Sequence, residues 1–294
     1  MIRAPMGSKE LWSELKKFRF ETIQEEEAIF QIPSANPVYR PQYVLNNTQH
    51  RLRFMLTLYS EGSPISLIPQ HFPGLLDAWE LSNRLSDEIC REHHLQTCRD
   101  WDFSLSNLNH YNWCFWLVGL ALALEIPDGQ WQRLLALVGG EGEDILLDRI
   151  IASRSSARRI GTEVRHARPY GRLLLAVDAP KEKQAALLRD FAEHWYAELK
   201  RPAPKNKKAP TIEPFWYLYG DPEKHPLEMG SYFGRWCIEA VAAVKAFELD
   251  DRLCLGHEHY PGDLLRPDGP TTHPARAEAP NPKPPGWFTK WLGK

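Results

Sequence analysis

The sequence predicts an all-α fold, a multi-helix bundle of two packed helical subdomains. Three observations support this prediction. Apolar residues recur at helical spacing through most of the 294 residues. No segment shows the sustained alternation of apolar and polar residues that is typical of a half-buried strand. Proline, glycine and small polar residues interrupt the periodic segments where connections between helices are needed.

The N-terminal half is expected to contain a row of amphipathic helices. Ser8 can cap the first of them, and the acidic run 21–27 closes it. A second helix is expected over 44–59, before a Gly-Ser-Pro breaker, and a third over 73–93. The segment 107–125 is apolar on nearly all sides, which predicts a central buried helix.

The C-terminal half is also expected to be helical, although one segment is ambiguous. Pro180 suits the first position of a helix that runs to residue 200. The apolar run 173–177 fits either a strand or a buried helix, because it is too short for periodicity to decide. The other helices are expected over 131–138, 143–152 and 225–247.

The chain divides into an N-terminal helical domain over 8–126, a C-terminal helical domain over 127–266 and a tail over 267–294. The tail is rich in proline and lacks apolar periodicity before its end, so we expect it to be extended or mobile. It ends in an apolar cluster that either docks on the helical body, which we favour, or inserts into a partner: Trp287, Phe288, Trp291 and Leu292.

One internal similarity is visible. Residues 112–128 and 235–251 align at a constant offset of 123 residues with six identities. This similarity predicts two related helical halves, whose central helices each end in an acidic turn.

Composition restricts the cellular setting. The five cysteines are odd in number and form no C-x-x-C motif, which predicts reduced thiols in a cytoplasmic protein. The first ten residues lack the apolar stretch of a signal peptide, and the longest apolar run, 113–124, is too short to span a bilayer. We therefore expect a soluble protein without a membrane partner.

Charge is distributed unevenly. Residues 75–148 contain 13 acidic and 4 basic residues, whereas 149–208 contain 15 basic and 6 acidic ones. The two blocks could be solvated faces that partly neutralise each other, or one block could face a partner of opposite charge. The arginines between Arg154 and Arg172 could also bind nucleic acid, but the pI of about 6.6 and the lack of interleaved aromatic residues favour other roles.

The segment 232–266 gathers the side chains that could carry chemistry. Glu239 lies within an apolar helix, where a carboxylate needs hydrogen bonds or a shifted pKa. No nucleophile or second acid is patterned around it, so we expect a structural acid that accepts hydrogen bonds from Tyr, Trp or backbone N–H groups.

A metal-dependent hydrolase is the alternative. Asp250, Asp251, His257 and His259 are its candidate ligands. Their spacing matches neither the EF-hand loop nor H-E-x-x-H, so a structural role is favoured for them too. The sequence contains no phosphate-binding glycine loop and no G-x-S-x-G motif.

The polar residues of this segment form a recognisable pattern. Its key positions are Trp236, Glu239, Asp250, Asp251, Tyr260 and Asp263. The full pattern, G-x-W-x-x-E-A-x-A, then D-D, then H-x-x-Y-P-x-D-L, resembles the C-terminal domain of the PoNi family, immunity proteins of the polymorphic toxin PoNe. The resemblance covers 131–266, and the N-terminal part is similar to the family's first domain more weakly.

The resemblance implies an all-helical immunity protein that binds a cognate secreted toxin, often a type VI secretion effector, and protects producing and sister cells. For this family the toxins are typically DNases. It implies no catalysis, so we expect no catalytic residue, cofactor or metal. The six signature residues would then hold the fold together.

The expected toxin-binding residues are acidic. A nuclease carries a basic surface for phosphate, and an inhibitor gains association rate and specificity by offering carboxylates to it. The loop acids of the acidic block are the candidates, and we expect them to be exposed: Asp128, Glu141, Glu143 and Asp144.

Overall fold

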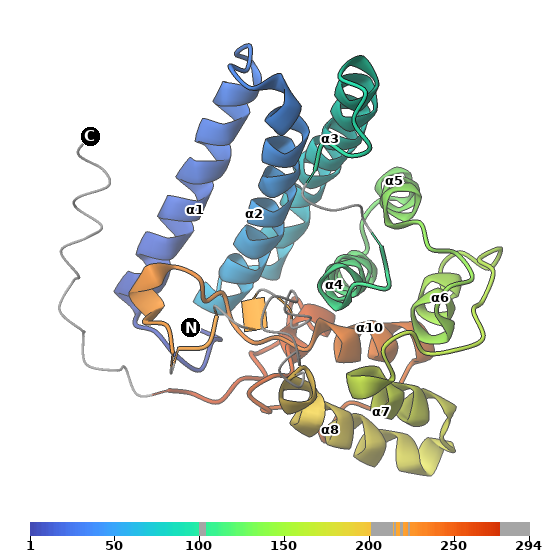
Figure 1. Ribbon diagram of the computed structural model, residues 1–294. Helices are drawn as coiled ribbons and strands as arrows, with labels where there is room; N and C mark the ends of the chain where they lie inside the picture. Colours follow the sequence, from blue (N-terminus) through green and yellow to red (C-terminus); the bar gives the residue numbers. More distant parts are fainter. Residues whose placement is uncertain (100–103, 201–213, 215, 218–219, 223, 277–294) are drawn as a thin grey trace.

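The computed structural model describes residues 1–99, 104–200, 214, 216–217, 220–222 and 224–276. Within these ranges every regular element is an α-helix or a 3₁₀-helix, and no strand is present (Figure 1). The prediction of an all-α fold is confirmed. The boundaries that we placed between domains stay a prediction.

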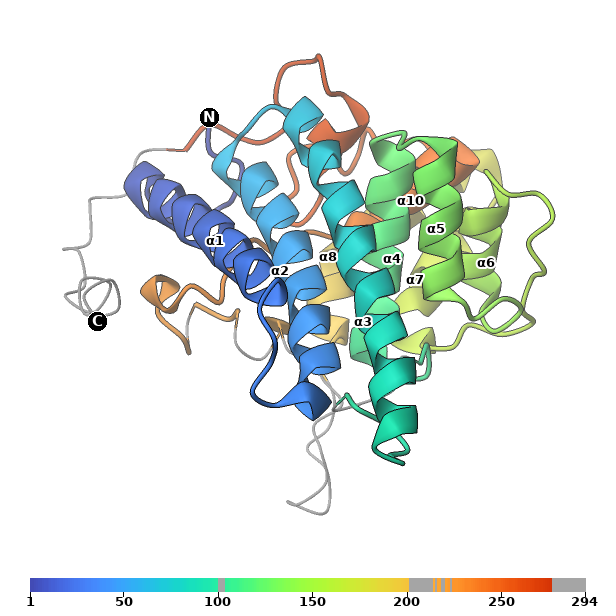
Figure 2. The same ribbon diagram turned by 90° about the horizontal axis from the view of Figure 1, so that it is seen from above.

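Three long helices form one part of the molecule. They are α1 (Lys9–Phe30), α2 (Arg40–Glu61) and α3 (Phe72–Glu92). Figures 1 and 2 show them side by side, with α2 between the other two. The Ser8 hydroxyl accepts a hydrogen bond from the backbone N–H of Leu11, as expected of the first cap. Gly62 ends α2 in the left-handed conformation that glycine adopts without strain.

The remaining helices surround one buried pair, α4 and α10. The elements are α4 (Leu108–Ala123), α5 (Asp128–Val138), α6 (Ile145–Ala152), α7 (Ala167–Asp178), α8 (Lys181–Glu198) and α10 (Ile238–Phe247). Helix α4 is buried on almost every side, as its composition predicted. It packs closely on α10 because Gly119 has no side chain: a Cβ there would lie 2.8 Å from Cγ2 of Ile238.

Two expectations about secondary structure change. The ambiguous run 173–177 is helical and belongs to α7. The helix expected over 225–247 is wrong in its first half, which contains only the 3₁₀-turn Leu227–Met229 before α10 begins at Ile238. Gly230 and Gly234 have φ of +71° and +100°, values incompatible with a right-handed helix.

The matching segments 112–128 and 235–251 are alike in structure as well. Helix α4 is followed by Glu125 with φ of +51°, and α10 is followed by Glu248 with φ of +53°. Both helices therefore end in an acidic residue in the left-handed conformation. Lys245 of α10 donates to Oε1 of Glu125 at 2.7 Å, so the two helix ends also meet.

One carboxylate joins four helices. Glu239 of α10 is fully buried, and its Oε1 accepts hydrogen bonds from Asn112 of α4 at 2.8 Å, from the Tyr170 hydroxyl of α7 at 2.7 Å and from the Trp195 indole of α8 at 3.2 Å. The Trp116 indole donates to Oε2 at 3.1 Å. Every one of these donors belongs to the protein itself, so the carboxylate satisfies its hydrogen-bonding needs without an open cleft.

Burial raises the pKa of Glu239 to about 7, even though the hydrogen bonds from its own backbone N–H, Tyr170, Trp195 and Trp116 lower it. Its donors are neutral. The surroundings therefore favour a carboxyl group that holds its proton to higher pH than an exposed glutamate does.

The first part of the tail is packed on the body. Thr271 and Thr272 donate to Asp263, and His273 is buried with Nε2 at 2.7 Å from the Tyr59 hydroxyl. Residues 267–276 contain no regular helix, in line with the expectation of an extended segment, but these contacts attach them to the body. The predicted cluster of Trp287, Phe288, Trp291 and Leu292 lies outside the described residues.

The expectation of five reduced cysteines is wrong at one pair. Cys90, near the end of α3, is bonded to Cys98 in the following loop, with the two Cα atoms 5.7 Å apart. The chain turns back after α3 and brings these atoms to a separation that a disulfide spans. Cys114, Cys237 and Cys254 are free and buried.

The raised pKa of Glu239 predicts a pH dependence of stability. Between pH 4.5, the ordinary pKa, and about pH 7, the folded chain keeps a proton that the unfolded chain releases. Its stabilising contribution is complete below pH 4.5 and is lost as pH rises through 7. Relative to Glu239→Gln, the free energy of unfolding should fall by on the order of 3 kcal/mol from pH 4.5 to 8.

Urea unfolding of both proteins across this pH range measures the difference. The comparison with Glu239→Gln cancels the contribution of the buried histidines, which titrate in both proteins. Glu182→Gln, at an exposed position in the first turn of α8, is the control and should follow the wild type. A difference between wild type and Glu239→Gln that does not vary with pH would contradict the assignment.

Candidate functional site

Both aspartates of the pair Asp250–Asp251, in the segment 232–266, have partners within the chain. Asp251 is buried and accepts hydrogen bonds from the Tyr260 hydroxyl at 2.5 Å and from Arg266 at 2.5 and 2.9 Å. Burial and the Asp251 charge raise the pKa of Tyr260 far above its ordinary value, so the phenol stays a donor. Asp250 faces outward and pairs with Arg252 at 3.0 Å. The arrangement closes the loop 250–266 on itself.

Asp263 connects both ends of the described chain. Its carboxylate accepts hydrogen bonds from Arg3 at 2.6 Å, from Thr271 at 2.8 Å and from the backbone and side chain of Thr272 at 2.6 and 2.8 Å. Burial alone raises the pKa of Asp263, but these hydrogen bonds outweigh burial and lower the pKa below its ordinary value. This aspartate is an ionised anchor for the N-terminus and for the residues after 266.

The residues proposed for a metal-dependent hydrolase do not form a metal site. His259 is buried beside the ring of Trp195, and its Nδ1 lies 3.1 Å from the carbonyl oxygen of Arg235. Burial lowers the pKa of His259 to about 4. Asp251 accepts hydrogen bonds from Tyr260 and Arg266. In the part of the chain that the structure describes, no group of three or more His, Cys, Asp and Glu side chains is placed to hold a metal.

Trp236 links the signature segment to α2. Its indole N–H donates to the Ser60 hydroxyl at 2.8 Å, and its ring meets Tyr59 edge to face at 5.0 Å. The Ser60 hydroxyl in turn donates to the carbonyl oxygen of Phe233. The six signature residues thus divide into five that are buried and one, Asp250, that is exposed.

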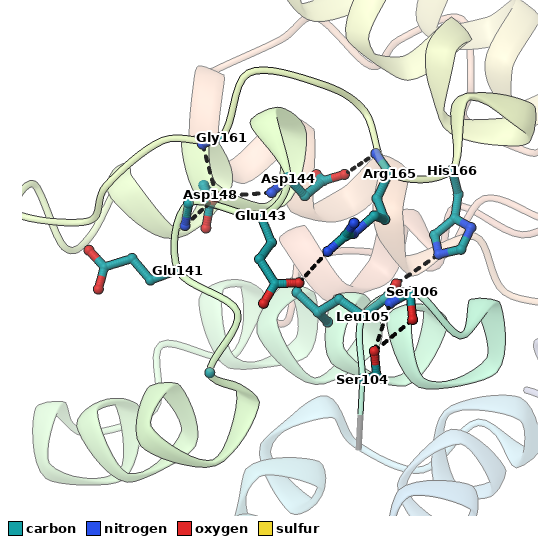
Figure 3. Close-up of polar contacts among 12 residues, drawn as sticks. Ser104, Leu105, Ser106, Glu141, Glu143, Asp144, Asp148, Gly161, Arg165 and His166 are labelled. Atoms are coloured by element: carbon teal, nitrogen blue, oxygen red, sulfur yellow. Dashed lines mark hydrogen bonds and ion pairs between the residues drawn. The ribbon is translucent and has the colours of Figure 1, made fainter. Parts of the chain in front are cut away.

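The loop 139–144 between α5 and α6, called the acidic loop below, contains one residue that is not exposed as expected, Asp144. Asp144 is fully buried and caps α6: it accepts hydrogen bonds from the backbone N–H groups of Leu147 and Arg165, both at 2.7 Å, and from the Tyr111 hydroxyl at 3.1 Å (Figure 3). Its place directly before an apolar helical run is a capping signal that the sequence analysis overlooked.

Sequence reasoning also missed Asp148. This buried aspartate of α6 accepts hydrogen bonds from the backbone N–H groups of Gly142, Asp144 and Gly161 at 3.1 to 3.2 Å. It also forms a buried ion pair with Arg158 at 2.7 Å. Asp148 therefore holds the loop before α6 and the loop after it together, as Figure 3 shows.

The other three candidate acids are exposed, and each has a basic neighbour. Asp128 pairs with Arg154 at 2.7 Å, and Glu143 pairs with Arg165 at 2.5 Å. Glu141 accepts a hydrogen bond from the backbone N–H of Arg159 at 2.6 Å. The acidic and basic blocks therefore meet in space and partly neutralise each other, which was the first of the two interpretations of the charge distribution.

This pairing also weakens the nucleic-acid hypothesis. A phosphate-binding surface presents guanidinium groups outward. Here Arg154 donates to the carbonyl oxygen of Ile126 as well as to Asp128, and Arg158 donates to the carbonyl oxygen of Gly139 as well as to Asp148. These arginines hold the acidic loop in place.

Within the described residues, no helix has both the length and the apolar character needed to cross a membrane.

Two family models and a solved structure match this chain. Residues 3–136 match the model of the PoNe immunity protein (PoNi) N-terminal domain, and residues 142–264 match that of the C-terminal domain. A crystal structure of protein PA2201 from Pseudomonas aeruginosa has the same fold at 17% sequence identity, with a TM-score of 0.67 over 90% of this chain and 89% of that one. The search of curated proteins gave no match. With both of its helical parts matched, the chain belongs to the PoNi family of immunity proteins.

Proposed function

We propose that this PoNi protein neutralises a cognate PoNe-type toxin by forming a stoichiometric complex with it. The observation that carries the proposal is that family models of both immunity domains together match most of the chain. The toxin is a secreted nuclease of a type VI secretion system, and the complex forms in the cytoplasm of producing and sister cells. The immunity protein itself needs neither a nucleic-acid partner nor a cofactor.

The chemistry of the signature segment supports binding over catalysis. The carboxylates of Glu239 and Asp251 accept hydrogen bonds from donors within the chain, so neither is positioned to act on an external substrate. A rigid helical body presents its loops in fixed positions, which lowers the entropic cost of binding a partner.

The acidic loop is the proposed contact for the basic surface of the toxin. Glu141 and Glu143 are exposed beside the left-handed turn at Gly139 and Gly140, and Asp128 is exposed at the start of α5. Asp144 has no part in the contact, because it is fully buried. Arginine neighbours hold these carboxylates in place without covering them, so a basic partner meets a preorganised acidic edge.

Co-expression tests the function. Cells that produce the toxin encoded beside this gene should grow only when the immunity protein is also produced, and the two proteins should elute together from a sizing column. The proposal fails if growth is not restored and no complex forms.

Charge reversal tests the acidic contact. Glu141→Lys combined with Glu143→Lys should weaken toxin binding about tenfold or more in low salt, because it places cations opposite a basic surface. Helical circular dichroism should be unchanged, since exposed ion pairs contribute roughly 0–1 kcal/mol each.

The matched control is Glu182→Lys, which reverses an exposed acid on α8 outside the loop. It should bind the toxin like the wild type in titration calorimetry. If the double variant and this control have the same dissociation constant, the acidic loop is not part of the interface.

A further inference from the structure

A second surface of the protein contains an unusual cavity. It has a volume of about 210 Å³ and lies between α1, α2 and the segment 230–233. Two arginines line it, Arg19 of α1 and Arg53 of α2, together with the aromatic rings of Phe18, Trp216 and Phe233. In Figure 2, α1 and α2 lie at the opposite end of the molecule from α5 and α6, so the cavity is separate from the acidic loop.

Arg19 is a buried cation whose hydrogen bonds are incomplete. Only 8% of the residue is exposed, and its Nη2 donates to the carbonyl oxygens of Gly230 at 2.6 Å and Tyr232 at 3.2 Å. Its Nε is buried and, in the part of the chain that the structure describes, has no hydrogen-bond partner. Among the described residues no carboxylate pairs with Arg19. Carbonyl oxygens satisfy donors but do not neutralise the charge, so this guanidinium still favours an anion.

The surroundings of Arg19 add positive charge. Burial, followed by the charge of Arg53, lowers the pKa of Arg19 to about 9, and burial lowers the pKa of Arg53 to about 10. His50 also lines the cavity. The acid next to it, Glu26, accepts a hydrogen bond from Asn47, and its Oε1 lies 2.8 Å from Nδ1 of His50. Arg19 and Arg53 therefore place two guanidinium groups in the wall of the cavity.

The rim of the cavity has the composition of a protein interface. Phe18 is 46% exposed, and Met229, next to the lining residue Gly230, is 53% exposed. Aromatic residues, methionine and arginine are enriched at the centres of protein–protein interfaces. A guanidinium also offers paired donors that match the planar fork of a carboxylate. An apolar rim around a cationic centre fits an acidic side chain carried by a protein better than a free ion.

We propose that this cavity is a docking site for one aspartate or glutamate side chain of the bound toxin. The proposal rests on the proposed function, because it assumes a toxin complex. The toxin carboxylate bonds to Arg19 while apolar residues around it cover Phe18 and Met229 and exclude water. Removal of water strengthens the ion pair between the toxin carboxylate and Arg19. The site would therefore be a hot spot of the interface.

Thr22 allows the site to be filled from within. It lines the cavity one turn after Phe18, and its hydroxyl donates only to the Phe18 carbonyl oxygen within α1. Thr22→Glu places a carboxylate beside the arginines, and Thr22→Gln is the neutral control of the same shape. Relative to Thr22→Gln, Thr22→Glu should raise the melting temperature of the free protein by about 2–4 °C. It should also raise the dissociation constant for the toxin at least about tenfold.

Each outcome of thermal unfolding and titration calorimetry is informative. Equal melting temperatures of Thr22→Glu and Thr22→Gln would show that the arginines do not accept a carboxylate, and would overturn the proposal. A higher melting temperature with unchanged toxin affinity would show that the cavity accepts a carboxylate but is not a toxin contact, which also overturns the proposal. In both cases tight binding by the wild type leaves the proposed function intact. If the wild type does not bind the toxin, the proposed function and this inference fail together.

Discussion

The buried carboxylate of Glu239 is the constraint around which the C-terminal half is arranged. A carboxylate removed from water must be hydrogen-bonded, and these donors come from α4, α7 and α8. Helix α4 must hold two such side chains, Asn112 and Trp116, at a fixed depth and rotation, and α7 and α8 must each hold one. The indole of Trp216 extends the network by donating to Oδ1 of Asn112 at 2.7 Å. An apolar core would pack without this requirement, whereas the polar network specifies one arrangement of the helices.

Two further groups of charges attach the loops to this core. Asp263 connects the N-terminus and the residues after 266, and the Asp148–Arg158 pair connects the loops on either side of α6. Both use acids that could be mistaken for catalytic groups. The exposed acids Glu141 and Glu143 and the cavity lined by Arg19 take no part in these contacts.

Local signals in the sequence predicted much of this structure, and long-range contacts account for the rest. Helical periodicity located most helices, and the apolar context of Glu239 indicated a structural acid before its donors were known. The expected helix over 225–247 was wrong because Gly230 and Gly234 adopt left-handed conformations that allow an extended chain against α2. The burial of Asp144 depends on Tyr111 and Arg165, and the Cys90–Cys98 bond depends on a loop that turns back. The burial of Arg19 comes from residues 230–233, far away in sequence, so helical periodicity alone cannot predict it.

We propose that this protein inhibits the toxin by forming a complex with it and not by a catalytic reaction. Titration of the purified toxin with increasing amounts of the immunity protein, followed by an assay of residual toxin activity, tests it directly. Inhibition by a tight complex predicts that activity falls linearly and reaches zero at a fixed molar ratio of the two proteins, with no further change over time. Progressive loss of toxin activity at substoichiometric amounts would show turnover, and would contradict the account.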